Sequence, residues 1–390
     1  MFDFDVFFTP PIALIGSGSI KRVPKKINDL HAETPLIVTD KGIVATGILK
    51  QLTDILDTEG MKYAVFDGTV PNPTDSNVLD GVAIYKAKNC DSIITLGGGS
   101  AHDCGKGIGI IVSNGGDICD YEGINKVKID LPAYVAINTT AGTASEITRF
   151  CIITDSKRKV KMSIIDWHLT PKIAINDPML MIGMPPSLTA ATGMDALTHA
   201  IEAYVSTNST PITDACAERS MRLIALNLRT AVTQGGNVVA RNNMCYAQYL
   251  AGMAFNNAGL GYVHAMAHQL GGMYNLPHGE CNAILLPHVE SYNLSTNYRK
   301  FYNIARLFDR NINELTEEEA APLAIDAIKE LSAYVGIPSN IRNLAKRYKK
   351  EVSMDDIPMM VKNAQKDACA MTNPCPISEE DITKLFKAAF

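Results

Sequence analysis

Five side chains in the second half of the chain have the types and spacing of ligands for a divalent metal ion. Asp195 and His199 lie four residues apart in a helix-like segment, so both would project from one face. His264 and His268 repeat that spacing, and His278 follows in a Pro-His-Gly turn. One carboxylate with several imidazoles suits iron, zinc or another first-row divalent ion. A catalytic ion keeps one position open, so one of the five is expected outside the ligand set, and spacing does not say which.

Taken singly, these residues have ordinary structural explanations. An Asp/His pair four residues apart is more often a surface or capping pair, and a lone histidine in a turn is usually only a turn residue. The clustering favours the metal, because three of the eight histidines fall within residues 263–279, beside strongly apolar segments. Buried imidazoles need partners, and one shared ion satisfies several of them.

A second chemical feature is a short apolar strand, residues 92–96, that runs into Gly97-Gly98-Gly99-Ser100 and then into a helix. Glycines let a backbone come close to a ligand, and a helix N-terminus offers unpaired N–H groups to a pyrophosphate. The order matches neither GxGxxG nor the Walker pattern, and a purely structural glycine turn is the alternative interpretation.

Two further polar loops follow predicted strands, where open parallel sheets bind ligands. Asp40 follows the second predicted strand and could accept hydrogen bonds from an adenosine ribose while repelling a 2′-phosphate. Its alternative role is that of a helix N-cap. Residues 138–146 form the other loop, which is rich in small hydroxyl side chains. Three such strand ends together favour a dinucleotide lying across the edge of the sheet.

The elements that must position these residues change character near residue 185. Before it, short apolar runs alternate with helix-like segments, which predicts a parallel sheet covered on both faces. After it the apolar periodicity is almost wholly helical. We therefore expect an α/β domain at 1–185 and a helical domain at 186–390. The predicted strands are 12–15, 35–39, 63–66, 92–96, 133–138 and 172–176, and the predicted C-terminal helices are 189–205, 212–234, 238–260, 261–274 and 317–335.

Composition narrows the function classes. A net charge of −5 and a pI near 5.9 give no reason to expect nucleic acid, and no apolar run reaches the roughly 18 residues of a membrane span. The first residues lack the basic and apolar regions of a signal peptide. Nine scattered cysteines, with no CxxC pair, argue against a disulfide framework. We expect a cytoplasmic protein.

The motifs together resemble those of the iron-dependent (group III) alcohol dehydrogenases, over essentially the whole chain. Residues 103–109 and 176–183 look most like the members of that family that act on 1,3-propanediol. The matching segments are 71–74, 97–100 with Asp103, 139–146, 191–202, 263–271 and 277–279.

The resemblance implies a Rossmann-like N-terminal domain and an all-α metal-binding domain, in a dehydroquinate synthase-like architecture with the site in the cleft between them. It implies that Asp195, His199, His264 and His278 bind the metal, iron first and zinc, nickel or manganese as alternatives. His268 then corresponds to a histidine that relays protons and is not a ligand.

The resemblance also assigns residues to the cofactor and the substrate. Asp40 matches the position associated with a preference for NAD over NADP. The residues that fall where relatives contact the dinucleotide are Asn72, Gly98, Gly99, Ser100, Asp103, Thr139, Thr140, Thr143, Ser145 and Lys161. Those expected to line the substrate pocket are Cys151, Phe255 and Cys369.

The activity implied is the NAD-dependent interconversion of a primary alcohol or diol and its aldehyde, with 1,3-propanediol and 3-hydroxypropanal as the expected pair. A broad-specificity primary alcohol dehydrogenase of the same family is the alternative, and relatives assemble as dimers or decamers. Two other hypotheses are a polyol dehydrogenase or dehydroquinate synthase-like lyase, and a metal- and nucleotide-binding regulatory module. Departures from the family pattern at Glu280, Cys281 and Cys375 leave substrate and subunit contacts open.

Overall fold

The computed structural model describes residues 5–158 and 160–390 and divides into two compact units. One unit is Phe8–Gly183, and the other is Met184–Phe390 together with the described residues 5–7. The sequence places the division after residue 185 and counts the first residues with the α/β domain.

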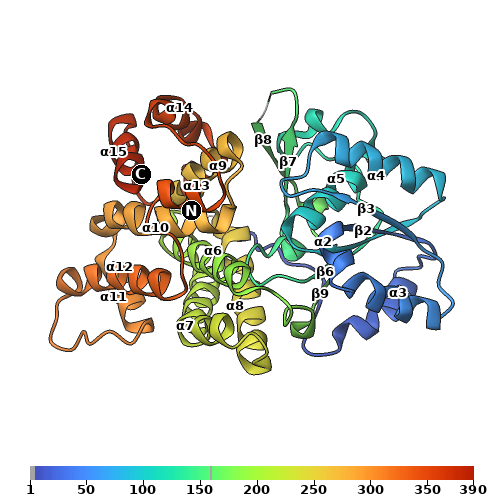
Figure 1. The fold of residues 1–390 in the computed structure, drawn as a ribbon, viewed down its shortest axis with the longest axis horizontal. Helices are drawn as coiled ribbons and strands as arrows, with labels where there is room; N and C mark the ends of the chain where they lie inside the picture. The colour runs from blue at the N-terminus through green and yellow to red at the C-terminus, as the bar shows by residue number, and fades with distance from the viewer. Residues whose placement is uncertain (1–4, 159) are drawn as a thin grey trace. The chain divides into compact units, whose positions relative to one another are not determined.

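The first unit contains a six-stranded sheet in the order β1-β9-β6-β4-β2-β3, with every neighbouring pair parallel (Figure 1). All six predicted strands are present in it. Their bounds are β1 Ile12–Ile15, β2 Pro35–Asp40, β3 Ala64–Thr69, β4 Ser92–Gly97, β6 Ala133–Asn138 and β9 Ile173–Asn176.

Alternate side chains of these strands serve two separate cores, because successive residues of a strand point to opposite faces. Leu36, Val38 and Ile93 pack with α4 (Asp75–Ala87) and α5 (Gly99–Asn114) on one face. Ile37 and Ile94 pack with α1 (Val23–Asp29) and α3 (Ile48–Thr58) on the other. The near-continuous apolar runs in the sequence are thus explained by burial on both faces. The five-residue α2 (Lys41–Ala45) directly follows β2.

A small second sheet completes this unit. β7 (Phe150–Asp155) and β8 (Val160–Ile165) form an antiparallel hairpin, and β5 (Gly123–Ile124) pairs parallel to β8. The alternating pattern of residues 151–165 predicts this hairpin, and the structure confirms it.

The second unit is helical, as predicted. Within the part of the chain that the structure describes, no helix is both long and apolar enough to cross a membrane. The helices of the second unit are α6 Pro186–Val205, α7 Pro211–Thr233, α8 Val238–Ala258, α9 Tyr262–Tyr274, α10 His278–Asn293, α11 Tyr298–Leu307, α12 Glu317–Tyr334, α13 Ile341–Arg347, α14 Ile357–Lys366 and α15 Glu379–Ala389 (Figure 1). The sequence prediction did not include α10, α11, α13, α14 or α15. Of these, α10 begins at a histidine and contains Pro287.

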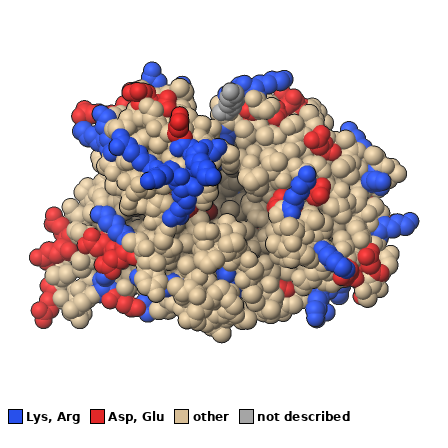
Figure 2. All heavy atoms as spheres, in the orientation of Figure 1, with Lys and Arg blue, Asp and Glu red and all other residues tan. Residues whose placement is uncertain are grey.

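Charge is unevenly distributed over the helical unit. Figure 2 shows lysines and arginines gathered on one face of this unit. On and just after α13, Lys346, Lys349 and Lys350 are exposed. Part of this cluster is structural, because Arg347 Nη1 lies 2.7 Å from Oε1 of the buried Glu280. Glu280, one of the departures from the family pattern, therefore fastens the start of α10 to α13.

Candidate metal centre and dinucleotide site

Three of the predicted ligands converge inside the helical unit. Asp195 and His199 project from one face of α6, and His264 comes from the first turn of α9. All three are buried, and their candidate ligand atoms lie within 4.8 Å of one another. A mixed oxygen and nitrogen donor set of this kind fits a first-row divalent ion.

His278, the first residue of α10, approaches the same cluster. Its Nε2 lies 3.7 Å from Asp195 Oδ1, and its ring centre is 5.2 Å from that of His264. A tetrahedral ion with bonds of about 2.1 Å separates its ligand atoms by roughly 3.4 Å, so this spacing suits a shared ion. Gly279 permits the approach, since a Cβ there would lie 2.4 Å from the carbonyl oxygen of Ala191 in α6.

Glu202 holds His264 in the form that a metal requires. Its Oε2 is hydrogen-bonded to His264 Nδ1, and its Oε1 accepts the backbone N–H of Val263 at 2.7 Å. Burial lowers the pKa of His264 well below its usual value, so the ring is neutral. With the proton on Nδ1, Nε2 keeps its lone pair for an ion. Glu202 lies seven residues after Asp195 on the same helix face, a signal that sequence reasoning did not use.

Replacing Glu202 with glutamine is expected to weaken metal binding about ten- to a hundredfold, because the carboxyl group that holds His264 Nδ1 is lost. Chelator competition measures the change. The matched control is Glu218→Gln. Glu218 lies on α7, and its Oε1 accepts a hydrogen bond from the Tyr204 hydroxyl at 2.5 Å. Equal metal affinity in the two variants would show that Glu202 does not orient the ligand.

His268 lies beside this cluster with a different partner. Its Nδ1 is 2.8 Å from Asp367 Oδ2, and its ring stacks on His278 with centres 5.4 Å apart. Although burial opposes it, the interaction with His268 holds the pKa of the Asp367 carboxyl below its usual value. Sequence reasoning missed Asp367, which is 99 residues from its partner.

The three predicted substrate-pocket residues lie in different surroundings. Phe255 on α8 stacks on His199, with ring centres 4.3 Å apart, and gives the metal cluster an apolar wall. Cys369 is half-buried, and its backbone N–H donates to Asp367 Oδ1 at 2.9 Å. Cys151 is in β7 of the other unit, fully buried, with Sγ 3.2 Å from the carbonyl oxygen of Asp103.

A further side chain, which sequence reasoning missed, enters the metal cluster. Asn282 on α10 is buried, and its Nδ2 lies 2.8 Å from Asp195 Oδ1. The same nitrogen is 3.0 Å from His264 Nε2 and 3.1 Å from His278 Nε2. Asn282 lies four residues after His278 on one helix, a spacing that could have drawn attention to it.

The glycine loop of the α/β unit links β4 directly to α5, whose N-cap is Gly98. Gly97 has a φ of +155°, which favours glycine, and the 16-residue helix leaves its first N–H groups available. A Cβ on Gly98 would lie 3.0 Å from Thr140, and one on Gly99 would lie 3.0 Å from Thr143. The two loops therefore pack closely at the carboxyl ends of the neighbouring strands β4 and β6.

This edge is the point where the strand order reverses. From β2 the chain continues to β3 on one side, and from β4 it continues to β6 and β9 on the other. Ligands of open α/β sheets bind at such a switch point. Asp40, at the end of β2, lies beside the glycine loop, because a Cβ on Gly97 would be 3.6 Å from its Oδ2. Its Oδ1 caps α2 by accepting the Ile43 N–H at 3.0 Å, so the alternative capping role is present as well.

Lys106, which sequence reasoning also missed, holds the end of the loop at residues 138–146 and the residues that follow it. This fully buried ammonium group donates to carbonyl oxygens of Ser145, Thr148 and Phe150 at 2.7, 3.0 and 2.7 Å. Asp103, one turn earlier on α5, accepts the Ser145 hydroxyl at 2.7 Å, and burial raises the pKa of its carboxyl to about 6. Asp103 therefore contacts Ser145 and, like Lys106, holds this loop.

The remaining predicted cofactor residues lie in three places. Thr139 and Thr140 follow β6, and the backbone N–H of Thr140 donates to Asn138 Oδ1 at 3.0 Å. Asn72 and Lys161 lie on either side of Thr154, which pairs with Lys161 in the hairpin and whose hydroxyl is 3.5 Å from the Asn72 carbonyl oxygen. Ser100 is in the first turn of α5.

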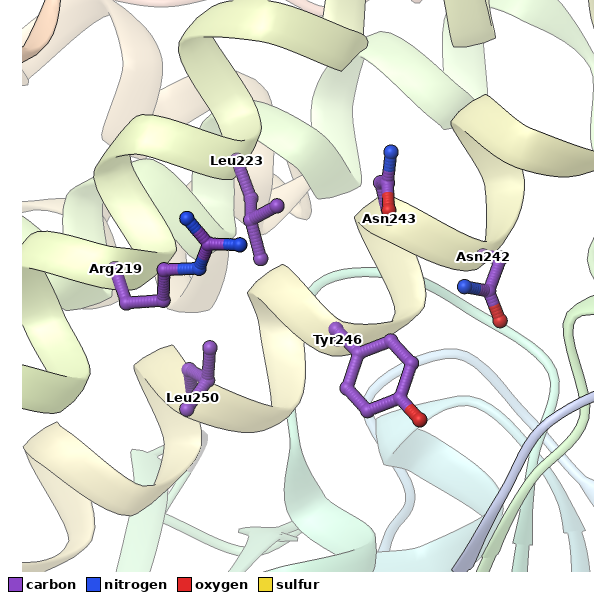
Figure 3. A pocket seen from close by; sticks show the side chains of 6 residues that line it. All are labelled: Arg219, Leu223, Asn242, Asn243, Tyr246 and Leu250. Atoms are coloured by element: carbon purple, nitrogen blue, oxygen red, sulfur yellow. The ribbon is translucent and has the colours of Figure 1, made fainter.

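A surface hollow between α7 and α8 is a separate feature (Figure 3). It has a volume of about 310 Å³ and contains none of the predicted site residues. Its lining residues are Arg219, Leu223, Asn242, Asn243, Tyr246 and Leu250.

Comparison with known proteins covers nearly the whole chain. A family profile described as iron-containing alcohol dehydrogenase matches residues 10–178, and the C-terminal profile of the Fe-containing alcohol dehydrogenase family matches 189–390. The chain is 50% identical to a 1,3-propanediol dehydrogenase of Klebsiella pneumoniae, covering 100% of this chain and 99% of the relative. It is 44% identical to an NAD-dependent methanol dehydrogenase of Bacillus methanolicus, with coverages of 98% and 99%. A crystal structure of 1,3-propanediol oxidoreductase superposes with a TM-score of 0.96 at 49% identity, covering 100% of both chains.

Proposed function

Because the chain belongs to the iron-containing alcohol dehydrogenase family, we propose that it interconverts a primary alcohol or diol and its aldehyde with NAD as the redox cofactor. The observation that carries the proposal is the buried convergence of Asp195, His199 and His264, approached by His278. These four residues would hold one divalent ion, iron first. When bound, the ion supplies a Lewis acid for the substrate oxygen, and NAD supplies the hydride acceptor.

The protein's own residues orient the reactants and move the proton. Phe255 presents an apolar wall against His199, which suits the carbon chain of a small alcohol. Because Nδ1 of His268 is hydrogen-bonded to Asp367, Nε2 is the ring atom that would accept and release the alcohol proton. The side chain of His268 is 14% exposed, which offers that proton a route to water.

The dinucleotide would lie across the β2, β4 and β6 strand ends. Its pyrophosphate would meet the N-terminus of α5 behind the glycine loop, which is a favourable place for an anion. Asn72 and Lys161, together with Thr139, Thr140 and Thr143, are proposed as further contacts.

Replacing Asp40 with serine is expected to raise the ratio of kcat/KM for NADP over NAD by at least about tenfold. Serine keeps an oxygen that can cap α2 but removes the charge that repels a 2′-phosphate. Steady-state rates with both cofactors measure the ratio. Asp54→Ser on α3, which breaks only an exposed pair with Lys50, is the control. An unchanged ratio in the Asp40 variant would contradict the ribose role.

The substrate proposed is 1,3-propanediol, oxidised reversibly to 3-hydroxypropanal. Its support is the 50% identity over the full chain to a relative named for that substrate. A broad-specificity primary alcohol dehydrogenase is the second candidate, supported by the 44% identity to a methanol dehydrogenase.

The test is the formation of NADH after anaerobic loading with iron, with 1,3-propanediol, butan-1-ol and methanol as substrates. The highest kcat/KM with 1,3-propanediol supports the first candidate, and similar values for all three support the second. No turnover of any alcohol or aldehyde by iron-loaded protein would contradict both and favour a binding module. Metal analysis of protein purified without added metal then identifies the ion.

We also propose that the protein is a cytoplasmic homo-oligomer, a dimer or a decamer. None of the nine cysteines, all of which lie in the described residues, forms a disulfide, which suits a reducing compartment. The helical unit exposes large apolar side chains, among them Val239 at 70% and Leu226 at 53% exposure. Light scattering of the purified protein distinguishes the assembly sizes.

A further inference from the structure

The side chain of Asn282 meets three of the four proposed metal ligands at the atoms that they would offer to an ion. Its Nδ2 lies 2.8 to 3.1 Å from Asp195 Oδ1, His264 Nε2 and His278 Nε2. We propose that this amide competes with the ion for the ligand lone pairs, and thereby stabilises the ligand cluster in metal-free protein. The inference rests on the ligand set proposed above.

The orientation of the amide follows from the chemistry of its neighbours. All three nearby atoms are hydrogen-bond acceptors in the protonation states that metal binding requires. Glu202 keeps the proton of His264 on Nδ1, so the lone pair on Nε2 faces Asn282. A carboxylate oxygen of Asp195 would repel the amide oxygen, so the NH₂ group is the end that points into the cluster.

The position of Asn282 on the fold explains how it reaches all three ligands. It lies one turn after His278 on α10, and the absence of a side chain at Gly279 allows this part of α10 to pack closely on α6. Asp195 comes from α6 and His264 from α9. Asn282 is fully buried, so water has little access to replace its hydrogen bonds. One amide thus joins ligand atoms from three helices.

A lone pair that accepts an amide N–H cannot at the same moment bind an ion. The NH₂ group has two hydrogens, and each imidazole Nε2 has a single lone pair, whereas a carboxylate oxygen has two. Binding of an ion to His264 and His278 must therefore break the contacts of the amide with their Nε2 atoms, and these contacts stabilise only the metal-free form. Removing it leaves buried acceptors without a donor in that form, at a cost typical of lost buried hydrogen bonds. Because the dissociation constant is set relative to the metal-free form, the loss of Asn282 should tighten metal binding.

The experiment compares Asn282→Ala with the unsubstituted full-length protein, each stripped with a chelator and titrated with Zn²⁺ against a chromophoric competitor. We expect the Kd for Zn²⁺ to fall at least about fivefold in the variant. The Tm of the stripped variant should fall by more than the Tm of the loaded variant. Asn282→Ser, which keeps a small polar side chain too short to reach the ligands, should change Kd in the same direction if the alanine variant folds poorly.

Asn293→Ala is the matched control, because Asn293 is a buried asparagine on the same helix that donates to Glu290 and Asn373. It should lower both Tm values alike and leave Kd unchanged. An unchanged Kd in both Asn282 variants would overturn the proposal, and a weaker one would show that Asn282 orients or binds the ion. Failure of the unsubstituted protein to bind Zn²⁺ would overturn the ligand set itself.

Discussion

Replacing His264 with alanine is expected to abolish metal binding and alcohol oxidation together. His264 offers a neutral Nε2 from the interior of the ligand cluster, and its other nitrogen is held by Glu202. The substitution removes one donor and leaves the buried Glu202 carboxyl without its ring partner. We expect kcat to fall at least about a thousandfold, since the Lewis acid is lost with the ligand. Metal analysis and NADH formation on the same preparation measure both effects.

His288→Ala provides the control for this prediction. His288 is the remaining histidine of the helical unit, ten residues beyond His278 on α10 and so about 15 Å further along the helix. Its replacement should leave metal content and kcat close to those of the unsubstituted protein. Full activity in a metal-free His264 variant would refute the proposed metal chemistry.

Replacing Lys106 with methionine is expected to destabilise the α/β unit by about 3–5 kcal/mol, because it leaves a buried polar cluster without its cation. Three carbonyl oxygens of the segment 145–150 lose their donor, and methionine fills a similar volume without supplying one. Since that segment begins two residues after Thr143, we also expect KM for NAD to rise at least about tenfold. Denaturant unfolding and hydrogen exchange over residues 143–150 measure the effects.

Lys88→Met is the comparison for Lys106, because Lys88 is exposed at the end of α4. It should change the free energy of unfolding by no more than about 0.5 kcal/mol. A loss below about 1 kcal/mol in the Lys106 variant, with unchanged protection of residues 145–150, would refute its supporting role.

The parts of the fold that could be predicted are those whose pattern repeats along the chain. Strands such as β2 and β4 are short apolar runs buried on both faces, so their positions follow from residues 35–40 and 92–97 alone. The helix α10 was missed because it begins at His278, in what looks like a turn, and because Pro287 interrupts its interior. Buried neighbours override a local signal of this kind, since tertiary packing supplies most helical stability.

For the candidate site too, the sequence predicts which residues take part, but it does not distinguish all of their roles. The pairs Asp195/His199 and His264/His268 have equal spacing in the sequence, so spacing cannot tell their roles apart. The family resemblance assigns His268 to proton transfer, and the structure adds a physical distinction. Glu202 partners His264 inside the ligand cluster, whereas Asp367 partners His268 beside it.

Sequence patterns alone predicted the five candidate metal-binding side chains, the glycine loop between strand and helix, and the two kinds of domain. Those features are local, because a helix face or a strand–loop–helix unit is set by residues a few positions apart. The packing of distant segments shows which of these candidates meet and which side chains hold them. Glu202 reaches His264 across 62 residues, Asn282 reaches Asp195 across 87, and Asp367 reaches His268 across 99. Such contacts arise from the packing of α6, α9, α10 and the segment after α14, which no short window of the sequence contains.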